Sequence, residues 1–416
     1  MIQKNPTTAI LFAMIIGAFV GSVFNFIQND FINTFVVNGV FEVIGQIFIK
    51  FLKMLVVPLV FVSLVCGVAS LSDLSKLGRV GGKALLFYLA TTAVAIVLAL
   101  SLAVIFAPGK DFALKTSAEQ TFTSAEPPPL AQTIINMVPS NPIQAMAEGQ
   151  MLPLIVFSLL FGIALVMTGE AGRRIEQQFN DYNAVIMNLV TLLMKLAPLG
   201  VFCLLAKTFA VQGFDVIKPL LGYFSVVILA LFLHLFITYP LLIKLLSGQN
   251  ILTFLKKMYP VQIFAFSTAS SNATIPVNIE NAEKNLGVDN SIASFTIPLG
   301  ATINMDGTAI MQGVATIFIA NVYGIDLSMG DFLAVVLTAT LASIGTAGVP
   351  GVGLIMLAMV LKQVGLPVEG IALIIGVDRL LDMLRTAVNV TGDATATVVI
   401  AKSEGALSQE IYNHND

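Results

Sequence analysis

Charged residues are scarce in this chain, and their scarcity limits the class of protein it can be. Asp, Glu, Lys and Arg make up 11% of its 416 residues, whereas 57% are hydrophobic. A soluble domain carries roughly a quarter charged residues. Mean hydropathy is +0.91, and the net charge of −3 is too small to indicate a nucleic acid partner. A soluble globular protein is therefore excluded, and an integral membrane protein is predicted.

Cysteine and histidine are also nearly absent, with two residues of each. Cys66 and Cys203 both lie in apolar runs, so neither a disulfide framework nor a metal cluster is indicated. His234 lies inside the run LALFLHLFITYP, where packing or a hydrogen bond is its ordinary role. An enzyme within the membrane would need a nucleophile with a base, or a metal cluster. No enzymatic activity is expected.

Eight apolar runs approach or exceed the roughly 20 residues that a helix needs to cross the hydrocarbon core. They cover residues 8–26, 40–71, 84–107, 151–167, 184–205, 220–246, 292–322 and 371–401. Eight spans place both termini on one side of the membrane. Lys and Arg collect in cytoplasmic loops, so their positions predict that both termini are cytoplasmic. The clusters on that side are Lys4, then Lys76, Arg79 and Lys83, then Arg173 and Arg174, then Lys244, Lys256 and Lys257, then Lys402.

Two further apolar segments are too short on either side of a break to cross the membrane. Residues 264–277 read FAFSTASSNATIPV, and residues 341–353 read LASIGTAGVPGVG. A helix break at membrane depth is tolerated only where protein, water or ligand satisfies the freed backbone groups. Paired broken segments indicate the binding site of a transporter. Two re-entrant hairpins are predicted, with tips at 270–276 and 343–351; two additional full crossings are the alternative.

The seventh run is interrupted by GATINMDGT at residues 300–308. Asn304, Asp306 and Gly307 are weak helix formers, so the helix is predicted to unwind there. Unwound carbonyl groups together with Asn304 and Asp306 would form a cage of hard oxygen ligands. Such a cage with few carboxylates suits a monovalent cation better than calcium. A simple kink is the alternative.

The last run, residues 371–401, carries charges that lipid could not accommodate. At about 100° per residue, five polar side chains share less than a quarter of the helix circumference. A charge near the bilayer centre costs about 3 kcal/mol even on a lenient scale, so this stripe must face protein, water or ligand. The stripe, which we predict to be a binding surface, comprises Asp378, Asp382, Arg385, Asn389 and Asp393.

Together these motifs resemble the glutamate transporter family, the dicarboxylate/amino acid:cation symporters. The resemblance rests on NMDGT at 304–308, SIGTAGVPG at 343–351, SSNATIP at 270–276 and the spaced polar residues of 378–393, with LGRVGGK at 77–83 and NPIQAMAEGQMLP at 141–153. It implies an all-α membrane protein with eight transmembrane helices, two re-entrant hairpins and a homotrimeric elevator fold. Residues 1–83 and 131–215 would form the scaffold. Residues 84–107 and 216–402 would form the transport domain, with hairpins near 251–285 and 328–365, followed by a polar C-terminal tail at 403–416.

The resemblance also implies roles for individual residues. Asp382 would bind the ammonium group of an amino acid, Arg385 would bind a side-chain carboxylate, and residues 349–353 would close over the substrate. The other implied substrate residues are Ser270, Ser271, Asn272, Met305, Thr308, Val349, Gly353 and Asn389. Several transported Na⁺ ions would be bound at three sites. Their implied ligands are Gly300, Asn304, Asn389 and Asp393; Thr302, Ser343, Ile344 and Thr346; and Tyr88, Thr91 and Thr92 with Asn304 and Asp306.

Some positions depart from the family pattern. Ala269 and Met383 are neutral where many members carry an extra Arg, and Gln312 stands where some relatives carry a proton-carrying Glu. Arg385 favours an acidic substrate, because a guanidinium binds a second carboxylate in bidentate fashion. We therefore predict sodium-coupled symport of L-aspartate or L-glutamate in the plasma membrane. The alternatives are a carrier of cystine, a neutral amino acid or a dicarboxylate, a proton-coupled carrier, and an ion channel.

Overall fold

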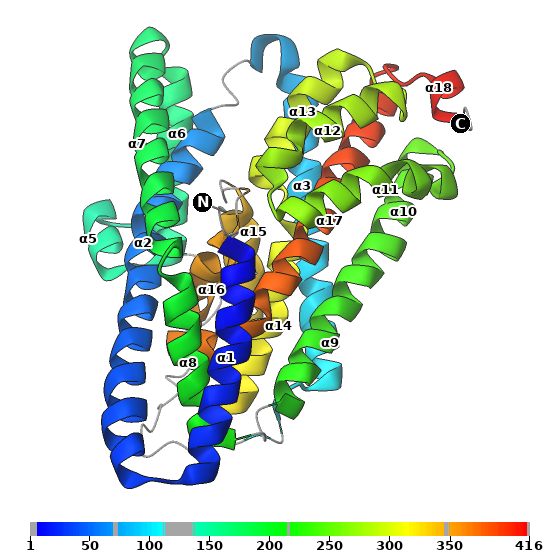
Figure 1. The fold of residues 1–416 in the computed structure, drawn as a ribbon. Coiled ribbons are helices and arrows are strands. Elements are labelled where there is room, and N and C mark those ends of the chain that lie inside the picture. Colours follow the sequence, from blue (N-terminus) through cyan, green and yellow to red (C-terminus); the bar gives the residue numbers. More distant parts are fainter. Residues whose placement is uncertain are drawn as a thin grey trace, which may run out of the picture.

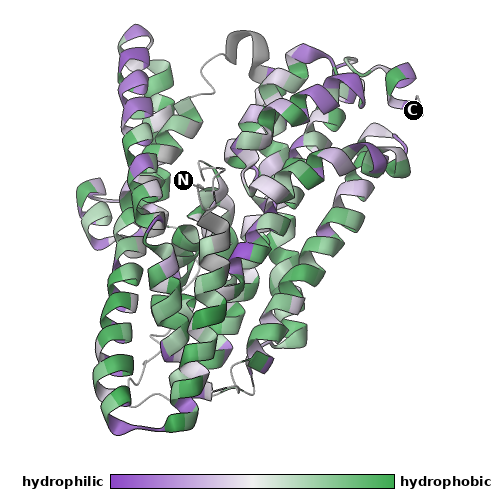
Figure 2. Cartoon of the chain, viewed as in Figure 1, coloured by the Kyte–Doolittle hydropathy of each residue, from purple (hydrophilic) through white to green (hydrophobic). Residues whose placement is uncertain are grey.

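The structure is a computed structural model. It describes residues 6–69, 74–110, 112, 135, 138–213, 217–344, 348 and 350–413. Within these ranges regular structure is helical, apart from one isolated β-bridge between Val288 and Leu407. The predicted all-α class is therefore confirmed. Hydrophobic residues cover the long helices, and hydrophilic ones gather at the upper end of α7 and around α18 (Figure 2).

The first half of the chain contains the helices on the left and at the front of Figure 1. α1 packs lengthwise on α8, while α2 packs on α6 and α7. α3 belongs instead to the group on the right, where it packs on α14 and α15. The bounds are α1 Pro6–Ile27, the π-helical segment Ile32–Phe41, α2 Glu42–Ala69, α3 Leu74–Phe106, α5 Pro142–Glu148, α6 Met151–Met167, α7 Glu170–Met194 and α8 Ala197–Gln212.

The second half of the chain surrounds its longest helix, α17, which spans Ile371–Ser403. α11, α13 and α14 all pack against α17 (Figure 1). The other bounds are α9 Ile217–Leu233, π-helical His234–Thr238, α10 Tyr239–Leu242, π-helical Ile243–Ser247, α11 Ile251–Thr268, α12 Ser271–Lys284, α13 Asn290–Ile303, α14 Asp306–Tyr323, α15 Met329–Ser343, α16 Val352–Gln363, 3₁₀-helical Val368–Gly370 and α18 Gln409–Asn413.

By length and composition, three of the described helical stretches can each cross a membrane: Ile32–Phe51, Arg79–Phe106 and Ile217–Ser247. A fourth is the pair Glu170–Leu193 and Ala197–Gln212, which is bent by 48°. The predicted run over 184–205 is therefore bent between the two helices. Pro198 lies in the first turn of α8, and its ring cannot continue the hydrogen bonding of α7. The count of eight spans stays a prediction.

The predicted breaks are present in the described segments. α13 ends at Ile303 and α14 begins at Asp306, so the seventh run is interrupted where the sequence indicated. α15 ends at Ser343 and α16 begins at Val352, which places the second tip between them. The first tip is shorter than the predicted 270–276. Ala269 adopts a left-handed conformation, and Ser270 already caps α12 by accepting from the Ala273 amide at 3.2 Å.

Two glycines explain how closely α1 and α8 approach. A Cβ atom at Gly17 would lie 2.7 Å from the Phe202 carbonyl oxygen, and one at Gly21 would lie 2.3 Å from that of Ala206. The four-residue spacing of Gly17 and Gly21 places both on one face of α1, as in other small-residue helix contacts within membranes. The backbones can meet only because both positions lack a side chain.

Gly21→Ala is therefore expected to destabilise the protein by about 1–3 kcal/mol, since an added methyl group would be forced against backbone. Thermal unfolding of the purified protein in detergent measures the effect. Gly82→Ala is the matched control, because no atom lies within 4 Å of a Cβ there. Removing a helical glycine at that open position should leave stability unchanged or raise it. Equal losses in the two variants would contradict the assigned contact.

Candidate functional site

The polar stripe of α17 faces the protein interior, as its composition predicted. Arg385 is fully buried, and Asp378, Asp382, Asn389 and Asp393 are each at most 8% exposed. Because α11, α13 and α14 cover this face, the charges are enclosed by protein. Figure 1 shows α17 running through the middle of these helices.

Arg385 bridges two carboxylates of its own helix. Its Nη1 donates to Asp378 Oδ1 and its Nη2 donates to Asp382 Oδ1, both at 2.7 Å. Asp378, the first residue of the predicted stripe, is thus a partner of Arg385. The third nitrogen, Arg385 Nε, makes no hydrogen bond within the described part of the chain. The guanidinium therefore keeps a donor at Nε that no described residue uses.

The second hairpin approaches this charged group through its glycines. The Gly351 amide lies 3.4 Å from Asp382 Oδ2. A Cβ at Gly353 would lie 3.2 Å from Arg385 Nη2 and 3.4 Å from the methyl carbon of Thr308. Gly353, Thr308, Asp382 and Arg385 are therefore brought together as predicted. Val349 lies outside the described residues.

The tips of the two hairpins touch each other. Ser270 Oγ donates to the Gly348 carbonyl oxygen at 2.8 Å, and the Asn272 amide donates to the same oxygen at 3.2 Å. A Cβ at Gly348 would lie 3.0 Å from the Cβ of Ser271. The serine-rich tip and the second tip thus meet through the backbone, and both lie beside α17.

Asn389 joins the stripe to the unwound segment between α13 and α14. Its Oδ1 accepts from the Gly307 amide at 2.7 Å, and its carbonyl oxygen accepts from Asn304 Nδ2 at 3.0 Å. Its Nδ2 lies 3.4 Å from the sulfur of Met305. The break at residues 304–305 is therefore satisfied by a side chain of α17, as a helix break at membrane depth requires.

Asp393 lies on the other side of the same segment. Its Oδ1 accepts from Asn304 Nδ2 at 2.9 Å. A Cβ at Gly300 would lie 2.4 Å from that carboxylate oxygen and 2.8 Å from the Tyr88 hydroxyl. Asn304 Oδ1 is buried and accepts no hydrogen bond within the described residues. Four predicted ligand residues, Tyr88, Gly300, Asn304 and Asp393, thus surround a point rich in hard oxygen atoms, which suits an alkali cation.

Asp306, the other predicted carboxylate ligand, is held by three side chains. Thr92 Oγ1 donates to its Oδ1 at 2.6 Å, and the Tyr239 hydroxyl donates to its Oδ2 at 2.8 Å. His234 Nε2 lies 3.1 Å from the same Oδ2. The hydrogen-bonded role expected for His234 is thus present, whereas Tyr239 was missed. The only sequence signal at Tyr239 was a hydroxyl next to Pro240 within an apolar run.

The other residues predicted to bind cations do not all meet at one point in the structure. Thr91 Oγ1 donates to the Tyr88 carbonyl at 3.1 Å, and Thr302 and Ser343 bond carbonyl groups of their own helices. A Cβ at Gly348 would lie 2.8 Å from the Ala301 carbonyl oxygen, so the second tip abuts the end of α13. Ile344 is buried at this junction. Thr346 lies outside the described residues.

Comparisons with known proteins agree with this geometry. A family model described as the sodium:dicarboxylate symporter family matches residues 7–403. The chain belongs to this family. Family membership makes it a transporter rather than an enzyme, as the sequence predicted.

Several relatives can be aligned with nearly the whole length of this member of the symporter family. A proton/glutamate-aspartate symporter of Escherichia coli (strain K12) is 40% identical over 407 residues, covering 95% of this chain and 92% of the relative. A proton/sodium-glutamate symport protein of Geobacillus stearothermophilus is 37% identical, covering 96% and 95%. A C4-dicarboxylate transport protein of Bacillus subtilis (strain 168) is 32% identical, covering 98% and 95%.

Two glycines allow the predicted cation and substrate sides of the site to be tested separately. Gly300→Ala is expected to weaken binding of the predicted cation, measured with Na⁺, at least 10-fold, because the methyl group would displace the Asp393 carboxylate. Gly353→Ala should instead weaken substrate binding, because it crowds Arg385. Ligand-dependent rises in Tm measure both affinities, since a ligand that binds only the folded state stabilises it. If both variants lost affinity for the cation and for the substrate to the same extent, the division of the site into two sides would be contradicted.

Proposed function

We propose that this chain is a sodium-coupled symporter of an acidic amino acid, L-aspartate or L-glutamate. The observation that carries the proposal is Arg385, fully buried, paired with Asp378 and Asp382, and retaining a donor at Nε. A guanidinium with a free donor edge binds a carboxylate in bidentate geometry. The substrate is thus recognised by its side-chain carboxylate.

The pair of Arg385 and Asp382 favours a substrate that carries both a carboxylate for Arg385 and an ammonium group for Asp382. A carboxylate that takes Nη2 of Arg385 deprives Asp382 of its 2.7 Å bond and leaves it with the longer, 3.4 Å ion pair to Arg379. Weakening the pairing of a buried charge is costly. The ammonium group of an amino acid restores that pairing. A C4-dicarboxylate has no ammonium group, and a neutral amino acid has no second carboxylate for Arg385. An acidic amino acid satisfies both residues at once.

The remaining polar atoms of the substrate fit groups around this pair. Thr308 and Asn389 lie on the elements that meet Arg385, and both are buried. The first tip supplies Ser270, Ser271 and Asn272 from the opposite side. These groups bind the α-carboxylate and backbone of the substrate, while residues 349–353 of the second hairpin cover it.

Charge balance requires a cation to accompany the substrate. Asp306, Asp378, Asp382 and Asp393 are all buried, whereas Arg385 is the one buried Lys or Arg within the described residues. An acidic amino acid adds a further negative charge to this site. Uncompensated charge inside the membrane is expensive, so bound Na⁺ ions offset it. The proposed sites are those that the resemblance implies: one around Asn304 and Asp393, one at the junction of the second tip with α13, and one at Tyr88, Thr91 and Thr92 with Asn304 and Asp306.

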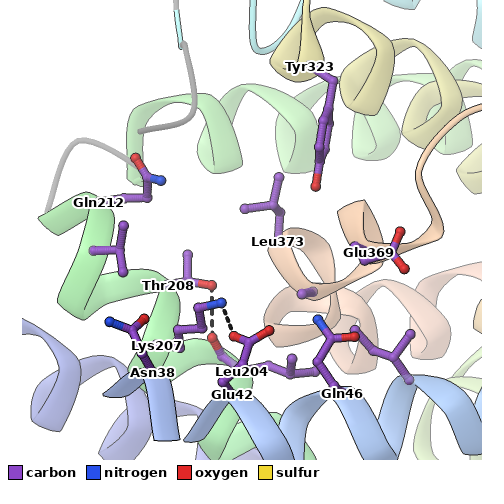
Figure 3. A pocket seen from close by; sticks show the side chains of 13 residues that line it. Asn38, Glu42, Gln46, Leu204, Lys207, Thr208, Gln212, Tyr323, Glu369 and Leu373 are labelled. Carbon is purple, nitrogen blue, oxygen red and sulfur yellow. Dashed lines mark hydrogen bonds and ion pairs between the residues drawn. The ribbon is translucent and has the colours of Figure 1, made fainter. Parts of the chain in front are cut away.

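The two groups of helices correspond to a scaffold and a moving unit in a homotrimeric elevator. The scaffold, residues 1–83 and 131–215, contains α1, α2, the start of α3 and α5 to α8. The transport domain, residues 84–107 and 216–402, contains the rest of α3 and α9 to α17. A cavity of about 230 Å³ lies between them. Figure 3 shows Glu42 and Lys207 paired on its scaffold wall, with Tyr323 and Glu369 on the facing wall. A polar, incompletely packed boundary resembles the interfaces across which domains move.

The plasma membrane is the proposed location, with both termini in the cytoplasm. The turn between α6 and α7, the corner between α10 and α11 and the C-terminal α18 all lie at the upper end of Figure 1. Positive clusters border these turns at Arg173 and Arg174, at Lys256 and Lys257, and at Lys402. Positively charged loops favour the cytoplasmic side, which supports this orientation.

Proton coupling is the second candidate. Its specific support is the buried contact of His234 with Asp306, because contacts between histidine and a carboxylate form proton relays in membrane transporters. The names of two relatives, a proton/sodium-glutamate symport protein and a proton/glutamate-aspartate symporter, also mention protons. Gln312 argues against the proton route through a Glu at that position.

Uptake by purified protein in liposomes distinguishes these candidates. Labelled aspartate, glutamate, cystine, serine and succinate are offered with an inward Na⁺ gradient, with a proton gradient, or with neither. We expect aspartate or glutamate to accumulate above the outside concentration only with the Na⁺ gradient. Accumulation driven by protons alone would overturn sodium coupling, and preferential accumulation of succinate would overturn the substrate assignment. Equilibration without accumulation would indicate a channel.

Arg385→Cys is expected to reduce acidic amino acid uptake by about 100-fold or more, because losing one partner of a buried charge pair costs about 2–5 kcal/mol. The smaller neutral side chain should admit serine or another neutral amino acid. Uptake is normalised to the amount of protein that elutes as the native oligomer, so that poor folding is not mistaken for lost recognition. Unchanged aspartate affinity would refute the role of Arg385.

A further inference from the structure

The long helical stretch Ile217–Ser247 contains two π-helical turns, of which the first is His234–Thr238. At this turn the Tyr239 amide donates to the carbonyl oxygen of His234, five residues earlier. In an α-helix, two residues five apart point about 140° away from each other. A π-helical turn instead places them one above the other, and such turns are rare and frequent at functional sites. His234 and Tyr239 therefore lie on one face of the helix only because the turn is π-helical.

Both of these side chains reach the carboxylate of Asp306. The centroids of the two rings are 4.5 Å apart, in an edge-to-face arrangement. The Tyr239 hydroxyl donates to Asp306 Oδ2 at 2.8 Å, and His234 Nε2 lies 3.1 Å from the same oxygen. All three side chains are fully buried. The π-helical turn thus directs two polar side chains at one of the predicted cation ligands.

The hydroxyl of Tyr239 also lies beside a second predicted cation ligand, Asn304. A Cβ atom at Gly392 of α17 would lie 2.4 Å from this hydroxyl and 2.4 Å from Asn304 Nδ2, so the two groups are separated by at most twice that distance. They can meet there because Gly392 has no side chain. Asn304 Nδ2 in turn donates to Asp393 Oδ1 at 2.9 Å. Polar contacts therefore run from Asp306 through Tyr239 and Asn304 to Asp393.

The other two partners of Asp306 have different surroundings. Thr92 Oγ1 donates its single proton to Asp306 Oδ1 at 2.6 Å, on the oxygen that Tyr239 does not use. The other ring nitrogen of His234, Nδ1, is buried and makes no hydrogen bond within the described residues. In that part of the chain, the side-chain hydrogen bonds of Thr92 and His234 thus end at Asp306. The hydroxyl of Tyr239 reaches further, to Asn304.

We propose that Tyr239 is a positioning residue that couples two of the cation sites, by holding Asp306 and Asn304 at a fixed separation. The proposal rests on the cation binding proposed above and deepens it, because it names the residue through which two sites act on each other. Asp306 and Asp393 are the carboxylate ligands of those two sites. Tyr239 contacts the first directly and the second through Asn304.

The coupling follows from the position of the hydroxyl between the two groups. A cation that attracts the Asp306 carboxylate also moves the hydroxyl that donates to it, and the hydroxyl limits where the Asn304 amide group can lie. The backbone of α17 at Gly392 closes the remaining side, so neither group can move away freely. Binding at either site then changes the affinity of the other by the same factor, because a coupling free energy is reciprocal.

Two variants that each remove one buried hydroxyl allow a matched test. Tyr239→Phe keeps the ring and removes the group that contacts both Asp306 and Asn304. Tyr223→Phe is the control, because Tyr223 is fully buried on the same helical stretch and its hydroxyl makes no hydrogen bond within the described residues. The two variants therefore lose the same atom and differ in whether that atom is used.

Equilibrium binding of radiolabelled Na⁺ to the purified full-length protein measures the coupling. We expect the wild type and Tyr223→Phe to bind cooperatively, with a Hill coefficient greater than one. Tyr239→Phe should lower that coefficient toward one and raise the half-saturating concentration at least about 5-fold, the lower end of usual couplings between sites. A purely structural role would raise the concentration and leave the coefficient unchanged. That result would overturn the proposal, and so would binding without cooperativity in the wild type.

Gly392→Ala tests the same point from the other side, because its methyl group would overlap both the hydroxyl of Tyr239 and the amide of Asn304. We expect it to lower the Hill coefficient as Tyr239→Phe does. Gly82→Ala, where a Cβ meets no atom within 4 Å, is the control and should bind Na⁺ like the wild type. Cooperativity like that of the wild type in Gly392→Ala would contradict the assigned contact.

Hydrogen–deuterium exchange in Na⁺-free buffer separates this proposal from the proposed function. We expect Tyr239→Phe to accelerate exchange over residues 300–308 by about 10-fold relative to Tyr223→Phe, the usual effect of losing a hydrogen bond to a charged group. Exchange over residues 251–284 should be equal in the two variants. If Na⁺ binds as expected but residues 300–308 exchange alike in both variants, the proposed function stands and the positioning role falls. If the wild type binds no Na⁺ while exchange differs as expected, sodium coupling falls and the positioning of Asp306 and Asn304 by Tyr239 stands.

Discussion

The buried guanidinium of Arg385 is the constraint on which the rest of the structure depends. A charge fully enclosed in a membrane protein needs partners on every side, and α17 itself supplies two of them, Asp378 and Asp382. This explains why the longest helix carries so many polar residues in an otherwise apolar chain. It also explains why α11, α13 and α14 pack on that helix, since an uncovered stripe would face lipid.

Three interruptions of regular helix meet at the covered stripe. The gap between α13 and α14 is satisfied by Asn389, and the two hairpin tips are joined by Ser270 and the Gly348 carbonyl. Each break frees backbone groups that a membrane cannot solvate, so it is stable only where another element reaches it. Helix breaks and buried polar side chains therefore occur at the same place, because the freed backbone groups and the polar side chains serve as hydrogen-bond partners for each other.

The sequence was most informative where membrane physics leaves few choices. The stripe of α17, the break at residues 304–305 and the second broken segment all followed from polar or weak helix-forming residues inside apolar runs. The sequence did not predict contacts between segments that are distant along the chain. Nothing local to Tyr239 indicates its bond to Asp306, and nothing in the polar sequence after Lys402 indicates that Tyr412 is buried under α11. The close approach at Gly17 and Gly21 had a signal, but one that is too common to be decisive.

Asn389 shows how the proposed coupling of substrate to cation arises from this convergence. Its side chain holds the amide of Gly307 beside the substrate residues, and its carbonyl oxygen accepts from Asn304, whose same Nδ2 donates to Asp393. A cation that draws the oxygen atoms of Asn304 and Asp393 together must therefore act on the position of Asn389. Substrate bound by Asn389, as proposed, would act on the cation site to the same extent, because a coupling free energy between two sites is reciprocal. No long-range pathway is needed, since one residue belongs to both proposed sites, through its side chain on one side and its main-chain carbonyl on the other.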